Sequence, residues 1–292
     1  MTNIKSWILA ARPKTLTASL VPIISTTGLV RGSGYAVHWW IVALALLSSF
    51  CIQIGTNLVN DAMDFKKGAD TETRIGPTRV TQQGHFSFQQ VMWAAGLAFA
   101  MAAGFGLPLV IYGGWPVLAI GVLSILMGYA YTSGPMPLAY HGLGDLFVIL
   151  FFGLIAVGGL FYLLTGVYTL SAFVLGLQIG FLSTVLIAIN NLRDINTDVL
   201  VNKKTLAVRL GLAGGRLWIG FLIFAPFLAG YYWISIQRFW VYVVPLVCFP
   251  LGMLIAKKIF RTPPSPEYNK YLGQSAAYSL IFSILLTIGF QI

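Results

Sequence analysis

Residues 53–79 read QIGTNLVNDAMDFKKGADTETRIGPTR, and in this stretch an apolar segment of the chain turns abruptly polar. Four polar side chains follow one another at i, i+3, i+4 and i+7: Asn57, Asn60, Asp61 and Asp64. On a helix with about 3.6 residues per turn, this spacing places all four on one face. A surface loop does not need such a register. The stretch therefore predicts a polar site where a hydrophobic helix leaves its apolar surroundings.

A second polar cluster closes another apolar segment further along the chain. Asn190, Asp194 and Asp198 form a ladder at i, i+4 and i+8, and Asn191 and Arg193 lie beside them. The chain has only 8 acidic residues in 292. Six of the eight belong to the two regions, four in the first and two in the second: Asp61, Asp64, Asp70, Glu72, Asp194 and Asp198. Because carboxylates are almost excluded elsewhere, this concentration indicates a function.

The composition places both clusters in a membrane protein. The chain is 58% hydrophobic and 9% charged, with a mean hydropathy of +0.83. Apolar runs of about 20 residues, long enough to cross ~30 Å of hydrocarbon, recur along it. The pattern predicts an all-α polytopic membrane protein, with residues 1–292 as a single integral-membrane domain. Nine spans are expected, at residues 16–30, 39–64, 88–112, 115–131, 143–164, 171–196, 216–235, 240–260 and 272–291.

The basic residues predict the orientation of these spans. With nine spans, the loops 66–79, 132–142, 203–209 and 257–270 fall on the side of the N-terminus. That side collects 16 of the 18 Lys and Arg residues, and the other side holds only Arg31 and Arg238. The positive-inside rule therefore places the N-terminus and both clusters in the cytoplasm. We expect a multi-pass protein of a bacterial cytoplasmic (inner) membrane. Topology and attraction to anionic lipid explain the net charge of +10, so no nucleic-acid partner is expected.

The chemistry of the clusters indicates a metal and a phosphate. Carboxylate and amide oxygens are hard ligands, which favour Mg²⁺ or Ca²⁺. Mg²⁺ typically takes one or two carboxylates together with water and substrate phosphates. Two pairs of carboxylates can therefore hold two Mg²⁺ ions, and four basic residues can bind the remaining phosphate oxygens: Arg74, Arg79, Lys203 and Lys204. The alternative, two solvated helix ends with salt-bridged loops, fits poorly with two matched clusters in so acid-poor a chain.

The residue patterns of the two clusters resemble the sequence motifs of a known family. NDAMD at residues 60–64 followed by Asp70, paired with DINTD at residues 194–198, is similar to the two aspartate-rich motifs of the UbiA superfamily of intramembrane prenyltransferases. The similarity extends over the whole chain, including ARPKTL at residues 11–16. Residues 57–79, 142–159 and 190–211 look most like the superfamily's 1,4-dihydroxy-2-naphthoate prenyltransferase branch. The two clusters close the second and sixth spans, four helices apart, which suggests a pseudo-repeated four-helix unit. The resemblance implies a UbiA-like bundle of nine helices, in which these two helices carry the motifs.

The resemblance also implies roles for individual residues. Two Mg²⁺ ions would be held by Asn60, Asp64, Asp70, Asp194 and Asp198. The catalytic carboxylates would be Asp61, Asp64, Asp194 and Asp198. The substrates would be bound by Asn57, Asn60, Arg74, Arg79, Tyr131, Asn190, Asn191, Arg193 and Lys203. Asp64 and Asp70 are six residues apart where the commonest superfamily motif has four, which leaves open whether Asp70 binds metal directly or through water.

The implied reaction transfers a polyprenyl group from a polyprenyl diphosphate to an aromatic acid in the membrane. With 1,4-dihydroxy-2-naphthoate as acceptor it releases CO₂ and diphosphate and gives demethylmenaquinol, a step of menaquinone biosynthesis. One alternative is another aromatic acceptor, such as 4-hydroxybenzoate or homogentisate. A second alternative is a secondary transporter that uses the carboxylates as an ion relay. Transporter sites tend to lie near the bilayer midplane on broken helices, whereas both clusters here close their spans.

Overall fold

The computed structural model of the chain describes residues 3–68, 75–76, 79–135 and 137–292, and every regular element within them is a helix. Seven segments of the described chain are long and apolar enough to cross a membrane. They are α3 (Trp39–Lys66), α4 (Phe88–Gly113), Gly144–Thr165, α8 (Leu170–Arg193), α10 (Leu206–Ser235), Phe239–Arg261 and α13 (Tyr268–Gly289). The helices α2 (Pro13–Gly32) and α5 (Trp115–Ala130) occupy the other two predicted places. The prediction of an all-α polytopic membrane protein is confirmed.

Two of the spanning segments change helix type along their length. The first joins α6 (Gly144–Val148), the π-helix η2 (Ile149–Ile155) and α7 (Ala156–Thr165). The second joins α11 (Phe239–Val243), the 3₁₀-helix η3 (Val244–Cys248) and α12 (Phe249–Arg261). Pro245 and Pro250 lie at the changes in the second, where the missing N–H groups interrupt the hydrogen-bond ladder. Three short helices lie outside the spans: α1 (Asn3–Ala11), η1 (Leu138–His141) and α9 (Ile195–Leu200).

The start of the seventh span differs from the expected position. It was expected at residue 216, whereas α10 begins at Leu206. The hydroxyl of Thr205 caps the first turn by accepting the Val208 N–H at 3.3 Å. Gly211 then takes a φ of 69°, which interrupts the helix before the long apolar part begins. A capped turn thus precedes the span in a stretch whose basic and glycine residues are typical of a loop.

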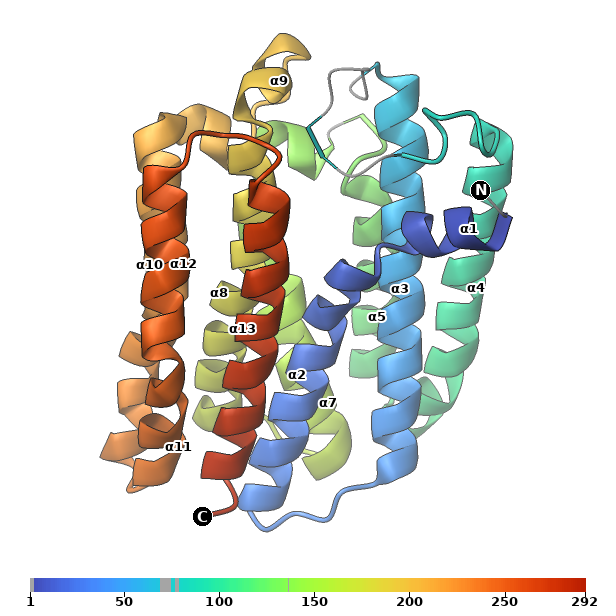
Figure 1. Ribbon diagram of the computed structural model, residues 1–292. Coiled ribbons are helices and arrows are strands. Elements are labelled where there is room, and N and C mark those ends of the chain that lie inside the picture. The colour runs from blue at the N-terminus through green and yellow to red at the C-terminus, as the bar shows by residue number, and fades with distance from the viewer. Residues whose placement is uncertain (1–2, 69–74, 77–78, 136) are drawn as a thin grey trace.

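Helix α8 is the centre of the bundle, and it packs against α10, α13, α2 and η2 (Figure 1). Its glycines allow η2 to approach at backbone distance. A Cβ atom on Gly153 would lie 2.4 Å from the Gly176 carbonyl oxygen, and one on Gly180 would lie 2.8 Å from the Ile149 carbonyl oxygen. Small residues of this kind commonly mediate close packing between membrane helices. The contact fixes the π-helical segment, which lines the central cavity, against the helix that carries the second cluster.

The first and last spans close the bundle by packing against each other. Ser25 and Ser283 are joined hydroxyl to hydroxyl at 2.7 Å, and the Ser283 hydroxyl also donates to the Val21 carbonyl at 3.2 Å. Further along, a Cβ atom on Gly32 would lie 2.4 Å from the Phe290 carbonyl oxygen. Hydrogen bonds between helices and close backbone contact are the interactions that hold membrane helices together.

The described parts of the loops expected on one side of the membrane lie at one end of the bundle, which we call the polar end. Figure 1 shows α9, the end of α3 and the connection from α12 to α13 at this end, whereas the C-terminus lies at the other. Helix α1 runs across the outside of α3 near the polar end (Figure 1). Trp7 of α1 stacks on Phe86 with ring centroids 4.0 Å apart. The stack fixes α1 to the connection between α3 and α4.

Candidate active site

A cavity of about 560 Å³ lies inside the bundle and is lined by residues from both acidic clusters. Its deeper wall is apolar and includes Phe151, Phe152 and Ile155 from the segment that contains η2. The predicted site residues that line it in the described part of the chain are Asn57, Asn60, Asp61, Asp64, Arg79, Tyr131, Asn190, Asn191, Arg193, Asp194, Asp198 and Lys203. Asp70 and Arg74 lie outside the described residues. The structure therefore brings together the ends of α3 and α8, 130 residues apart in the chain between Asp64 and Asp194.

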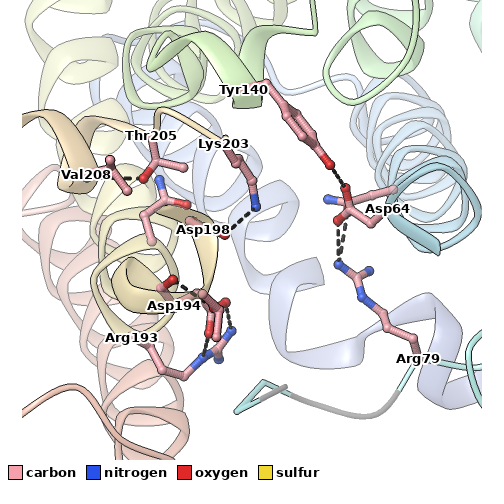
Figure 2. Close-up of polar contacts among 12 residues, drawn as sticks. Asp64, Arg79, Tyr140, Arg193, Asp194, Asp198, Lys203, Thr205 and Val208 are labelled. Atoms are coloured by element: carbon pink, nitrogen blue, oxygen red, sulfur yellow. Dashed lines mark hydrogen bonds and ion pairs between the residues drawn. The ribbon is translucent and has the colours of Figure 1, made fainter. Parts of the chain in front are cut away.

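Asp64 is the most closely held carboxylate of the first cluster. Its Oδ1 accepts a hydrogen bond from the Tyr140 hydroxyl at 2.9 Å, and its Oδ2 accepts one from Arg79 Nη2 at 3.0 Å (Figure 2). The same Nη2 donates to Asn60 Oδ1 at 3.0 Å. Asp64 and Arg79 are both buried, so this ion pair is poorly screened by solvent. Because Asn60 and Asp64 lie on the same face of α3, both accept hydrogen bonds from the Arg79 guanidinium.

Asp61 and Asn57 share that helix face and hold neighbouring segments of the chain. The carboxylate of Asp61 accepts the backbone N–H groups of Val80 at 3.2 Å and Thr81 at 3.1 Å. These two contacts fix the chain immediately after Arg79. The Asn57 amide donates to the carbonyl oxygen of Ala11 and to the hydroxyl of Thr15, both at 3.0 Å, and thereby joins α3 to the end of α1 and to the start of α2.

The second cluster is organised by Arg193 at the end of α8. Its guanidinium donates two hydrogen bonds to Asp194, from Nε at 2.8 Å and from Nη2 at 2.6 Å (Figure 2). Its Nη1 donates to Asn269 Oδ1 at 2.6 Å, and the Asn269 amide donates to the Ile75 carbonyl at 3.3 Å. Bidentate arginine–carboxylate pairs are directional and strong. Arg193 therefore fixes Asp194 and also connects α8 to α13 and to the segment that follows α3.

Asp198 is buried and has one carboxylate oxygen without a partner. Lys203 Nζ lies 3.3 Å from its Oδ1, whereas no donor in the described part of the chain bonds its buried Oδ2. Burial raises the pKa of Asp198 to about 6. Lys203 opposes this increase, and the charges of Asp194 and Asp64 add to it. The carboxylate is therefore ionised at pH 7 with an unused oxygen in the cavity wall.

Lys203 is influenced by the carboxylates of both clusters. Burial lowers the pKa of its ammonium group, but the charges of Asp198, Asp64 and Asp194 outweigh burial and raise the pKa above its usual value. Electrostatic influence of this kind requires short distances. The end of α3 and the end of α8 thus form one electrostatic site.

The raised pKa of Asp198 predicts how Mg²⁺ binding depends on pH. A metal ion needs the ionised carboxylate, so protons compete with it as the pH falls through about 6. We expect the affinity of the purified protein for Mg²⁺ alone to fall roughly fourfold between pH 7.5 and pH 5.5, from the ionised fraction of one such group. Calorimetric titration without diphosphate measures this affinity. A constant affinity over that range would contradict the predicted role of Asp198 as a metal ligand.

Two side chains that sequence reasoning left out of the site bond to its members. Asp145 is buried, and it accepts hydrogen bonds from Trp218 Nε1 at 2.9 Å and Asn191 Nδ2 at 3.4 Å. The Tyr140 hydroxyl donates a hydrogen bond to Asp64. Neither contact follows a helical spacing, so no pattern in the sequence indicates it.

An aromatic column leads from the polar end into the cavity. The ring centroid of Phe147 lies 5.6 Å from that of Tyr131 and 4.3 Å from that of Phe151, on which it is stacked. All three residues line the cavity. Their rings provide faces that can stabilise a positive charge.

Within the described residues, no group of three or more His, Cys, Asp or Glu side chains is arranged to hold a metal ion. Three of the carboxylates described above are paired with a basic side chain instead: Asp64 with Arg79, Asp194 with Arg193, and Asp198 with Lys203. Asp70, which was predicted to be a fifth ligand, lies outside the described residues.

The fold and the site define a membrane-embedded enzyme whose carboxylates and basic side chains meet in one intramembrane cavity. The sequence profile of the UbiA prenyltransferase family matches residues 20–281. The chain is 35% identical over 285 residues to the 1,4-dihydroxy-2-naphthoate octaprenyltransferase of Mycobacterium tuberculosis, covering 97% of this chain and 96% of that protein. It is 32% identical over 308 residues to the enzyme of the same name from Haemophilus influenzae, covering 99% and 97%.

A solved structure has the same fold. It is a UbiA homolog from Archaeoglobus fulgidus bound to GPP and Mg²⁺, with a TM-score of 0.62 and 16% identity, covering 98% of this chain and all of the other. The chain belongs to the UbiA prenyltransferase family, as its two aspartate-rich motifs predicted.

Proposed function

We propose that the protein transfers a polyprenyl group from a polyprenyl diphosphate to 1,4-dihydroxy-2-naphthoate, with release of CO₂ and diphosphate, to give demethylmenaquinol. The observation that supports this most strongly is the meeting of both acidic clusters and their basic partners at one end of a largely apolar cavity. The names of the relatives from M. tuberculosis and H. influenzae support the naphthoate acceptor.

The carboxylates fit a divalent cation. The unpartnered, buried Oδ2 of Asp198 is an available ligand, and Asp64 keeps lone pairs on both oxygens after its two hydrogen bonds. The protein ligands of two Mg²⁺ ions would be Asn60, Asp64, Asp194 and Asp198, with Asp70 as a further candidate. The A. fulgidus homolog with the same fold is bound to GPP and Mg²⁺, which supports a site for Mg²⁺ and a prenyl diphosphate in this fold. Bound Mg²⁺ would neutralise the negative charge that develops on the leaving diphosphate.

The basic side chains would bind the donor's phosphate oxygens. Arg79 and Lys203 line the cavity and now pair with Asp64 and Asp198. A guanidinium and an ammonium group positioned beside the metal ligands can donate to the oxygens that the metal leaves uncovered. Preorganised cations at this position stabilise the departing diphosphate as the carbon–oxygen bond breaks.

The rest of the cavity suits the prenyl group and the acceptor. Breaking the donor's carbon–oxygen bond leaves an allylic cation, which the faces of Tyr131 and Phe147 can stabilise. The naphthoate carbon that bears the carboxylate forms the new carbon–carbon bond, and CO₂ leaves without its bonding electrons, which restores the aromatic ring. Three buried hydroxyls of the cavity wall, unbonded within the described residues, can bond the acceptor's oxygens: Ser19, Thr132 and Ser183.

We also propose that the polar end faces the cytoplasm of a bacterial cell. The 16 basic residues of the loops expected at that end, against two at the other, support this orientation. Water-soluble naphthoate and Mg²⁺ would then reach the site from the cytoplasm, and the prenyl chain would remain in the apolar part of the bundle.

The acceptor can be tested by product analysis. Membranes containing the protein are incubated with a polyprenyl diphosphate, Mg²⁺ and each of three acceptors: 1,4-dihydroxy-2-naphthoate, 4-hydroxybenzoate and homogentisate. We expect a Mg²⁺-dependent prenylated naphthol, identified by mass, with one CO₂ released from carboxyl-labelled naphthoate per product. Turnover of 4-hydroxybenzoate or homogentisate without turnover of the naphthoate would reject the proposed acceptor and keep the proposed class of reaction.

A further inference from the structure

Tyr140 connects the two halves of the site through its backbone and its side chain. Tyr140 lies in the short helix η1, which is hydrogen-bonded to the segment that follows α9. The Tyr140 carbonyl accepts the Lys204 N–H at 3.1 Å, and the neighbouring His141 carbonyl accepts Arg209 Nη2 at 2.9 Å. The main chain of Tyr140 is therefore held beside the residues that follow Asp198.

The side chain of Tyr140 reaches the other cluster. Its hydroxyl donates to Asp64 Oδ1 at 2.9 Å (Figure 2). Its ring centroid lies 4.3 Å from the Nζ of Lys67, at the end of α3, and 5.7 Å from the Nζ of Lys203, which pairs with Asp198. Cations at these distances are attracted to the ring. Tyr140 is not among the residues that line the cavity, so it acts through Asp64 and the lysines.

We propose that Tyr140 is a positioning residue that sets the geometry between the two acidic clusters. This inference rests on the proposed function, because it concerns the same metal–diphosphate site. The carboxylate of Asp64 has about four lone-pair positions, and Tyr140 and Arg79 take one on each oxygen. A carboxylate held at both oxygens cannot rotate, and its remaining lone pairs keep a fixed direction toward the cavity. The ring meanwhile holds Lys203 between Asp198 and the end of α3.

The hydroxyl and the ring have separable effects. Tyr140→Phe removes the hydrogen bond to Asp64 and keeps the ring, whereas Tyr140→Leu removes both. A hydrogen bond to a charged group corresponds to about 10- to 100-fold in an equilibrium constant. We therefore expect Tyr140→Phe to weaken Mg²⁺ binding by about 10-fold or more with little change in diphosphate affinity. Tyr140→Leu should also weaken diphosphate binding several-fold, because Lys203 loses its contact with the ring.

Both affinities can be measured without the acceptor. The wild type, the two Tyr140 variants and Tyr129→Phe, an exposed tyrosine on α5, are titrated in detergent with Mg²⁺ at fixed inorganic diphosphate and then with inorganic diphosphate at fixed Mg²⁺. Thermal unfolding without ligand is recorded for each. The expected pattern is a wild-type unfolding temperature for Tyr140→Phe and Tyr129→Phe, with weaker Mg²⁺ binding for Tyr140→Phe alone.

Each outcome decides the inference. Wild-type Mg²⁺ affinity in Tyr140→Phe would overturn it. Equal loss of both affinities in the two Tyr140 variants, accompanied by lower unfolding temperatures, would also overturn it, since that is the behaviour of a residue that only supports the fold. If the wild type binds Mg²⁺ and diphosphate and Tyr140→Phe binds them equally well, only this inference fails. If the wild type binds neither, the proposed function fails with it.

Discussion

Asp64→Asn is expected to lower prenyl transfer by at least about 100-fold while the protein still folds and inserts into the membrane. Asparagine keeps the size of the side chain and one acceptor oxygen, so Tyr140 or Arg79 retains a partner. It removes the negative charge that a divalent cation needs. The assay measures labelled prenyl product per milligram of protein in membranes, with the amount of inserted protein determined by immunoblot.

Glu267→Gln makes the same chemical change at an exposed position outside the cavity and is the matched control. We expect its rate to stay within about twofold of the wild type, in line with the small effects of most surface substitutions. Full activity in Asp64→Asn would show that the Asp64 carboxylate is not one of the proposed metal ligands. Loss of activity together with loss of inserted protein would assign Asp64 to folding and contradict the prediction.

Lys203→Met is expected to weaken binding of the donor without weakening binding of Mg²⁺. The methionine side chain fills the space of the lysine stem without its charge. The affinity for the polyprenyl diphosphate should fall by about 10- to 100-fold, since a cation at the phosphate oxygens is lost. Binding of Mg²⁺ without diphosphate should not weaken, because Asp198, Asp64 and Asp194 lose a competing positive charge. The first effect is measured as the KM for the donor and the second by calorimetric titration.

The neighbouring Lys204→Met is a close control. Lys204 is exposed and contributes its backbone N–H to Tyr140, a contact that the substitution keeps. We expect near wild-type values for both measurements. Equal increases of the donor KM in Lys203→Met and Lys204→Met would show that general loop charge, rather than the position of Lys203 in the cavity, binds the donor.

The helical parts of the site could be predicted from the sequence, because the spacing of residues along a helix determines which side chains share a face. The i, i+3, i+4 and i+7 register on α3 places Asn60 and Asp64 where Arg79 binds both. The same register could not distinguish the role of Asp61 from the role of Asp64. The two lie on one face, but Asp61 is occupied by the backbone amides of Val80 and Thr81, whose positions depend on the path of the connection after α3.

Sequence patterns could not predict the contacts that side chains make across the bundle. Tyr140 and Asp64 are 76 residues apart, and Trp218 and Asp145 are 73 residues apart. No periodicity relates such positions, and a tyrosine in a short loop or an aspartate at a helix start has common structural explanations. Only the packing of η1 against the segment after α9, and of α10 against α8, brings these side chains to the site.

We propose that both acidic clusters together hold one pair of divalent cations around a diphosphate. The most direct test of this proposal replaces Mg²⁺ by Mn²⁺ and counts the bound ions by electron paramagnetic resonance, with and without inorganic diphosphate, in the wild type, Asp64→Asn and Asp198→Asn. We expect two Mn²⁺ per chain when diphosphate is present, magnetically coupled to each other and to ³¹P, and loss of this coupled pair in either variant. A coupled pair that persists in Asp64→Asn or in Asp198→Asn would contradict it.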